Sequence, residues 1–175
     1  MKKTLAAVAA ATLMVVPLLG ASSALAKPKA PPPSCYPNCE GVQSTAGYNA
    51  YNANMENGNF ANSDWSNARL MYATVKGSTF EGANMSSANM VNINAQSVNF
   101  SGANLTGAKL NKANLTGANL TGADLSGANL TKAQWKNANL TNANLLGAYG
   151  KLKKVKHATF NNTTCPDGTV TNTGC

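Results

Sequence analysis

A period of five residues runs through the middle of this chain and constrains its fold more than any other feature. Written in fives that end at multiples of five, residues 101–125 read SGANL, TGAKL, NKANL, TGANL and TGADL. From residue 55 to residue 145, 18 of the 19 closing positions are bulky and apolar, the exception being Ala95, and Ala fills 14 of the 19 positions two places earlier. Such regularity is typical of a repeat architecture.

Neither regular backbone conformation can use this period. On an α-helix a step of five residues rotates successive Leu side chains by roughly 500°, which spreads them over every face. On an uninterrupted strand an odd step sends successive Leu to opposite sides of the sheet. A chain that turns a corner every five residues instead directs the Ala and Leu of each short side to one interior, since residues two apart share a face. Gly and Asn, which suit such corners, fill 14 of 19 second places, so the sequence predicts an all-β solenoid.

The phenylalanines indicate how many sides each coil has. All four close a five-residue unit, at positions 60, 80, 100 and 160, and differ by multiples of 20. A four-sided coil places them in one interior column, and stacked aromatic rings are a favourable way to fill a core. We therefore expect about five coils of 20 residues within residues 51–149. Their predicted interior consists of Phe60, Phe80, Phe100, Leu105, Leu110, Leu115, Leu120, Leu125, Leu130, Trp135, Leu140 and Leu145.

Residues 1–26 have the pattern of a secretory signal peptide. Lys2 and Lys3 precede an apolar run over residues 5–19, and the triplet 24–26 reads Ala-Leu-Ala, a small-residue cleavage site. The apolar run is shorter than the roughly 20 residues of a membrane span. We expect an exported protein without a transmembrane span after cleavage, in the periplasm, in the medium, or in the thylakoid lumen if the source is a cyanobacterium.

Export changes how the four cysteines are interpreted, because oxidising compartments favour disulfides. Four cysteines allow three pairings. We expect the local pairs Cys35–Cys39 and Cys165–Cys175, since the repeat between them holds the two ends apart. The same separation argues against a zinc site built from all four thiolates, and no metal or cofactor is expected. Residues 27–50 are interpreted as a Pro-rich tether and N-terminal cap, and residues 150–175 as a C-terminal cap.

The triplets 103–105 (Ala-Asn-Leu), 118–120 (Ala-Asn-Leu) and 123–125 (Ala-Asp-Leu) resemble the pentapeptide-repeat family, whose pattern is A(D/N)LXX. The resemblance implies a right-handed quadrilateral β-helix, with disulfide-closed ends in this chain. Some members protect DNA gyrase by imitating duplex DNA, which requires a cytoplasmic, strongly acidic rod. This repeat holds six basic and four acidic residues, so that role and a nucleic-acid partner are not expected.

Catalytic side chains are scarce. The whole chain holds six acidic residues and one His, and the two repeat aspartates, Asp64 and Asp124, are separated by the length of three expected coils. No general acid/base pair is indicated. We therefore expect a non-enzymatic, rigid structural or protein-interaction module whose partner is an unidentified protein or envelope component. The exposed edges of a solenoid also allow an end-to-end homodimer.

A cluster of lysines beyond the repeat allows a second interpretation. The cluster consists of Lys151, Lys153, Lys154 and Lys156. It can act as a guard that prevents further strand pairing at the solenoid edge. It can also form a patch that binds an anionic polymer or lipid of the envelope. An aromatic stripe of the kind that binds sugars is not predicted, because Tyr72 and Tyr149 fall in different columns.

Overall fold

The computed structural model describes residues 33–43, 45–150, 152 and 155–175. The predicted signal peptide, residues 27–32 of the tether, and Lys151, Lys153 and Lys154 lie outside the described residues. Among the residues that are described, no helix is both long enough and apolar enough to cross a membrane.

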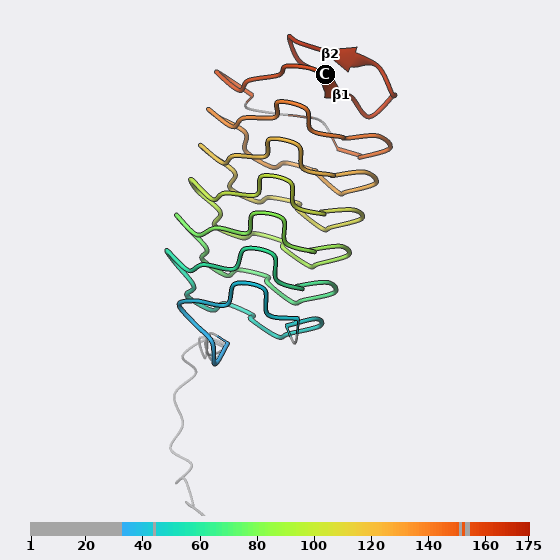
Figure 1. Cartoon of the computed structure of the whole chain (residues 1–175). Coiled ribbons are helices and arrows are strands. Elements are labelled where there is room, and N and C mark those ends of the chain that lie inside the picture. Colours follow the sequence, from blue (N-terminus) through green and yellow to red (C-terminus); the bar gives the residue numbers. More distant parts are fainter. Residues whose placement is uncertain (1–32, 44, 151, 153–154) are drawn as a thin grey trace, which may run out of the picture.

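The chain winds as a stack of coils (Figure 1). Each five-residue unit contributes a turn and one bridge residue, and parallel bridges join residues 20 apart, as in the column Asn54, Thr74, Asn94, Asn114 and Gln134. Each coil therefore has four short sides, as predicted from the phenylalanine spacing. Strand spacing sets the rise at about 4.8 Å per coil.

The third and fifth residues of each unit fill the interior. All twelve predicted interior residues have no exposed surface. The Phe60 and Phe80 rings stack with centroids 4.7 Å apart, and Phe100 follows at 5.5 Å from Phe80. Phe160 lies in the same column and is 7% exposed. Ile93 and Ala95 exchange the usual small and large positions, and both are buried. The total volume of the inward side chains on that side of the coil is therefore conserved.

The corners explain the preference for Gly and Asn at the second place of each unit. Residues at this position have a positive φ, for example 55° at Asn52 and 63° at Gly102. Gly and Asn adopt this left-handed conformation at least cost. Larger residues occupy four of the described corners nevertheless, with φ of 60° at Tyr72, 60° at Lys112, 62° at Lys132 and 61° at His157.

The coil is longer than the repeat predicts. One bridge column has seven levels rather than about five, and it consists of Asn38, Asn59, Thr79, Asn99, Asn119, Asn139 and Thr159. Cys39, which we expected in a cap, occupies an inward position without exposed surface, and its N–H donates to the carbonyl of Asn59 over 2.6 Å. The first step of the column, from Asn38 to Asn59, is one residue longer than the steps that follow. Because of this extra residue the first coil is out of phase with the later five-residue units. The period of the sequence therefore does not predict this coil.

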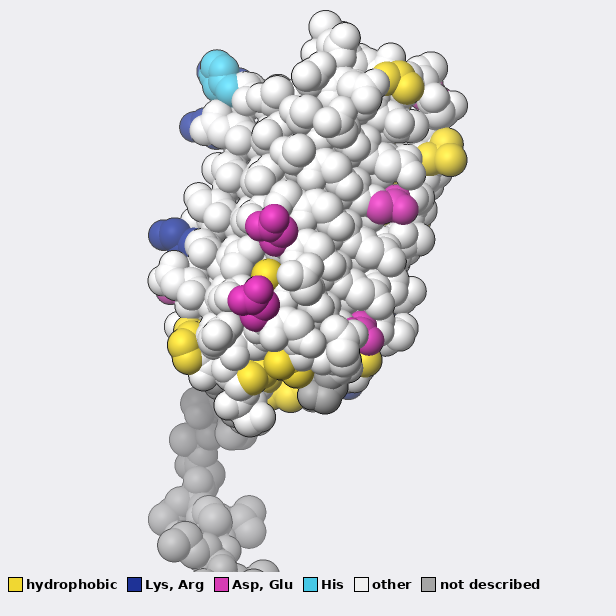
Figure 2. Space-filling view, viewed as in Figure 1, with side chains coloured by type: hydrophobic (Ala, Val, Ile, Leu, Met, Phe, Trp, Pro, Cys, Tyr) yellow, Lys and Arg dark blue, Asp and Glu magenta, His cyan; other side chains and the backbone are white. Residues whose placement is uncertain are grey.

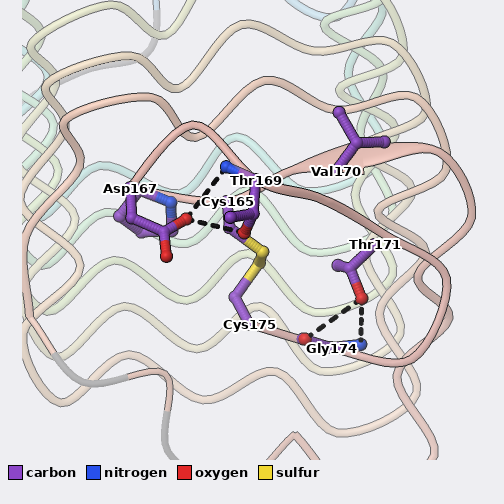
Figure 3. Close-up of a pocket in the computed structure, with 8 residues that line it drawn as sticks. Cys165, Asp167, Thr169, Val170, Thr171, Gly174 and Cys175 are labelled. Atoms are coloured by element: carbon purple, nitrogen blue, oxygen red, sulfur yellow. Dashed lines mark hydrogen bonds between the residues drawn. A yellow bond between two sulfur atoms is a disulfide. The ribbon is translucent and has the colours of Figure 1, made fainter.

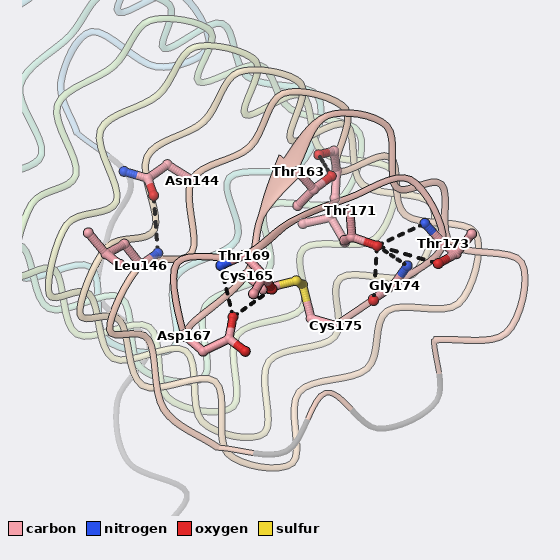
Figure 4. The surroundings of a disulfide bond; sticks show 11 residues. Asn144, Leu146, Thr163, Cys165, Asp167, Thr169, Thr171, Thr173, Gly174 and Cys175 are labelled. Atoms are coloured by element: carbon pink, nitrogen blue, oxygen red, sulfur yellow. Dashed lines mark hydrogen bonds between the residues drawn. A yellow bond between two sulfur atoms is a disulfide. The ribbon is translucent and has the colours of Figure 1, made fainter.

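An antiparallel hairpin covers the C-terminal edge of the coil. Strand β1 (Thr163–Thr164) pairs with β2 (Val170–Thr171) in the register Thr163↔Thr171 and Thr164↔Val170. Thr164 also forms a parallel bridge to Asn144 of the preceding coil. The disulfide between Cys165 and Cys175 closes this segment (Figure 4). The hairpin thus takes the place that a further coil would occupy on this side.

Candidate interaction surfaces

The outward residue in the middle of each side defines four faces, in the order in which the chain visits them. The columns are Asn59, Thr79, Asn99, Asn119, Asn139 and Thr159 for the first face; Asp64, Asn84, Asn104, Asp124, Asn144 and Thr164 for the second; Asn49, Arg69, Asn89, Lys109, Asn129 and Tyr149 for the third; and Asn54, Thr74, Asn94, Asn114 and Gln134 for the fourth.

Side chains of successive coils are hydrogen-bonded to one another on the first and second faces. The Asn119 amide donates to Asn99 Oδ1 over 3.0 Å, and the Asn84 amide donates to Asp64 Oδ1 over 3.1 Å. Within the described part of the chain, all amide-to-amide and amide-to-carboxylate bonds between coils occur on these two faces or on the corner that joins them. Their polar groups are therefore largely satisfied within the protein.

The same two faces carry most of the acidic residues. Asp64 and Asp124 lie on the second face, and Glu40 and Glu81 lie on the corner between the first and second faces. Glu40 accepts a hydrogen bond from the Asn59 amide over 3.0 Å, so even this carboxylate belongs to the amide ladder. Figure 2 shows acidic side chains over the middle and right of the visible face, with basic side chains along its left edge.

The third and fourth faces are basic. Arg69 and Lys109 lie on the third face, and the corners that flank the fourth face carry four further cations, which are Lys76, Lys112, Lys132 and Lys136. All six side chains are exposed. Among the residues that the structure describes, none of these cationic groups forms a hydrogen bond or ion pair. Charge is thus separated around the described part of the coil, with six unpaired cations on the third face and on the corners of the fourth face.

Both local disulfides predicted from the sequence are present. Cys35 and Cys39 have Cα atoms 5.0 Å apart, and Cys165 and Cys175 have Cα atoms 5.4 Å apart. No group of three His, Cys, Asp or Glu side chains suited to a metal ion occurs among the described residues. Of the predicted lysine cluster, only Lys156 is described. It is exposed on the corner between the fourth and first faces.

A hollow in the C-terminal segment lies beside the second disulfide (Figure 3). Its acidic side chain, Asp167, accepts hydrogen bonds from the hydroxyl and the N–H of Thr169 over 2.7 Å and 3.0 Å. These bonds, the hydroxyl contribution first, hold the pKa of Asp167 below its ordinary value. Both sulfur atoms of the hollow are in the disulfide, so its lining contains no free thiol.

The sequence matches the model of the pentapeptide repeats in eight copies, over residues 51–86, 80–117, 88–127 and 118–149. These matches cover more than half of the chain, so the protein belongs to the pentapeptide-repeat family. The fold is accordingly a right-handed, four-sided β-helix.

A solved structure agrees with this fold. Rfr23, a pentapeptide repeat protein from the cyanobacterium Cyanothece, is 24% identical with a TM-score of 0.54, and the match covers 63% of this chain and 85% of Rfr23. HetL from the cyanobacterium Nostoc, involved in heterocyst differentiation regulation, is 25% identical with a TM-score of 0.46 and coverage of 77% of this chain. The chain spans 62% of the length of HetL. No curated protein sequence matches.

Proposed function

We propose that this protein is an exported, non-enzymatic β-helix that serves as a rigid module for binding another component of its compartment. The continuous bridge column from Asn38 to Thr159 carries this proposal. Because each coil is bonded to the next and all coils share one apolar interior, the outer side chains are held at fixed positions. A surface of that kind is suited to recognition, and the described residues contain no constellation that suggests catalysis.

Two observations support export. The basic start and apolar run of residues 1–19 have the form of a signal peptide. All four cysteines are in disulfides, which persist in oxidising compartments and are rare in the cytosol.

Fractionation of the native source tests this proposal. We expect to find the protein outside the cytoplasm, with Lys27 as its first residue and no free thiols. We also expect gentle cross-linking to capture the same partner in repeated preparations. A full-length chain in the cytoplasm with reduced cysteines would contradict export. Turnover of a substrate by the purified protein in activity profiling would contradict a non-enzymatic role.

The lysine cluster gives a second candidate role, which is retention on an anionic polymer or lipid of the envelope. The exposed position of Lys156 supports it. Reversing the charges of Lys151, Lys153, Lys154 and Lys156 should then release the protein from envelope material at low salt, because electrostatic contacts are screened as salt rises. Unchanged retention of this variant would exclude the role.

A further inference from the structure

The fourth face is bordered by basic residues on both of its corners. In one coil Lys132 and Lys136 lie two residues to either side of Gln134, which points outward. In the preceding coil Lys112 occupies the same corner as Lys132, about 4.8 Å away along the axis. Three coils before Lys136, Lys76 occupies the same corner as Lys136, about 14 Å away. We call these four lysines and the outward residues Thr74, Asn94, Asn114 and Gln134 the fourth-face strip.

The backbone at Lys112 and Lys132 indicates that their side chains serve a purpose other than folding. Both residues have a positive φ, at a place in the repeat where Gly or Asn is usual. A lysine is strained there, and Asn92 shows that the same corner accepts the less costly residue. Tyr72, also at positive φ and 48% exposed, stands on this corner two coils before Lys112.

Electrostatics in the strip favours an anionic occupant. Like charges stacked in adjacent coils repel one another, as do like charges on neighbouring strands. Lys112 and Lys132 are stacked in this way and have no carboxylate partner among the described residues. Glu56, one coil before Lys76 on its corner, lies at the N-terminal end of the strip, which is basic from Lys76 onward. A bound polyanion would neutralise both rows.

The amides between the rows add hydrogen-bonding capacity. Asn114 Oδ1 accepts the N–H of Thr116 over 3.2 Å, which leaves its amide nitrogen free of partners among the described residues. The side chain of Gln134 has no described partner at all. On the first face, by contrast, the equivalent amide of Asn119 is used in the ladder. The fourth face therefore offers free amide groups that can bind hydroxyl groups.

We propose that the fourth-face strip binds a linear acidic polysaccharide that lies along the solenoid axis. The lysine rows would contact its carboxylate groups, the amides its hydroxyl groups, and the exposed ring of Tyr72 one sugar face. Two parallel rows that follow the axis suit an extended chain. The inference rests on the proposed function, since it names the partner class of the rigid module.

Binding of polygalacturonate, a linear carboxylated polysaccharide, to the purified protein tests this inference. The variant Lys112→Asn/Lys132→Asn removes two charges and installs the residue that the repeat itself uses at such corners. The matched control, Arg69→Asn/Lys109→Asn, removes two charges from the third face and installs the Asn of its own column, as at Asn89 and Asn129. Melting temperatures of both variants establish that they are folded, and we expect that of the corner variant to stay level or rise.

We expect the corner variant to bind polygalacturonate about tenfold more weakly and the control to change by less than about twofold, since two charge contacts are lost only in the first. Binding of the parent should weaken as salt is added. Equal weakening in both variants, or no binding by the folded parent, would overturn the inference. So would stronger binding to phosphatidylglycerol vesicles or polyphosphate. None of these results would affect the proposal of a rigid exported module, which fractionation and cross-linking test separately.

Discussion

The acidic first and second faces and the basic third and fourth faces are built on the same backbone but treat their polar groups differently. On the acidic side, amides and carboxylates are bonded to one another from coil to coil, as between Asn84 and Asp64. On the basic side, described cations such as Lys112 have no partner within the protein. A repeat can therefore use one side to stabilise its coils and leave the other available for recognition.

The largest expected effect tests whether the two sides share one core. Leu115 lies inside the fourth face and Leu105 inside the second, and both have no exposed surface. Replacing either with Ala should lower stability by about 2 to 5 kcal/mol, because each change leaves a cavity. Thermal unfolding measures both, with Thr116→Ala as a control that should change stability by less than about 0.5 kcal/mol. A control as damaging as Leu115→Ala would contradict the inward assignment.

Reduction of the disulfides should destabilise the two ends of the coil, with no difference between its acidic and basic sides. The bridges close short segments, Cys35–Cys39 and Cys165–Cys175, each contributing about 2 to 3 kcal/mol on the loop-entropy model. Melting with and without a reductant, followed by circular dichroism, should show a lower transition temperature with the β signal retained at room temperature. Loss of that signal on reduction would mean that the coil depends on its ends.

A pair of equivalent asparagines sharpens the comparison between the two sides. Asn119 on the first face accepts both the N–H and the hydroxyl of Thr121 and donates to Asn99, whereas Asn114 on the fourth face accepts only the Thr116 N–H among the described residues. Asn119→Ala should therefore cost about 2 kcal/mol more than Asn114→Ala, which is the value of two net hydrogen bonds. Chemical denaturation of the two variants measures the difference. Equal costs would show that the ladder does not stabilise the acidic side.

The smallest expected effect is a pH dependence of the stability of the C-terminal segment. Because hydrogen bonds from Thr169 lower the pKa of Asp167 in the folded protein, the resulting stabilisation is present above the ordinary carboxyl pKa and is lost as pH falls through the lowered value. Asp167 is exposed, so we expect only the C-terminal segment to loosen in acid. Hydrogen exchange of that segment between pH 5 and pH 2, with Asp167→Asn as the control, measures it. An unfolding midpoint that shifts for the whole coil would contradict this.

The coil could be predicted because inward residues recur at a fixed interval and because the spacing of the phenylalanines, in multiples of 20 residues, indicates four sides. The coil that contains Cys39 could not, since one extra residue between Asn38 and Asn59 shifts its phase. The stacking of Lys112 on Lys132 follows from the four-sided coil, because the two residues are 20 apart. The net charge of the repeat does not reveal this stacking, since it carries no information on where the charges lie. The unequal bonding of Asn114 and Asn119 could not be predicted, because both occupy the same place in the repeat and only side-chain orientation distinguishes them.

A crystal structure that resolves side-chain amides tests the central claim most directly, namely that one rigid coil carries a self-bonded acidic side and an unpaired basic side. We predict that equivalent residues of successive coils are stacked at about 4.8 Å, with amide ladders on the first and second faces. We also predict no carboxylate within ion-pair distance of Lys76, Lys112, Lys132 or Lys136. Ladders on all four faces, or carboxylates paired with these lysines, would contradict the account.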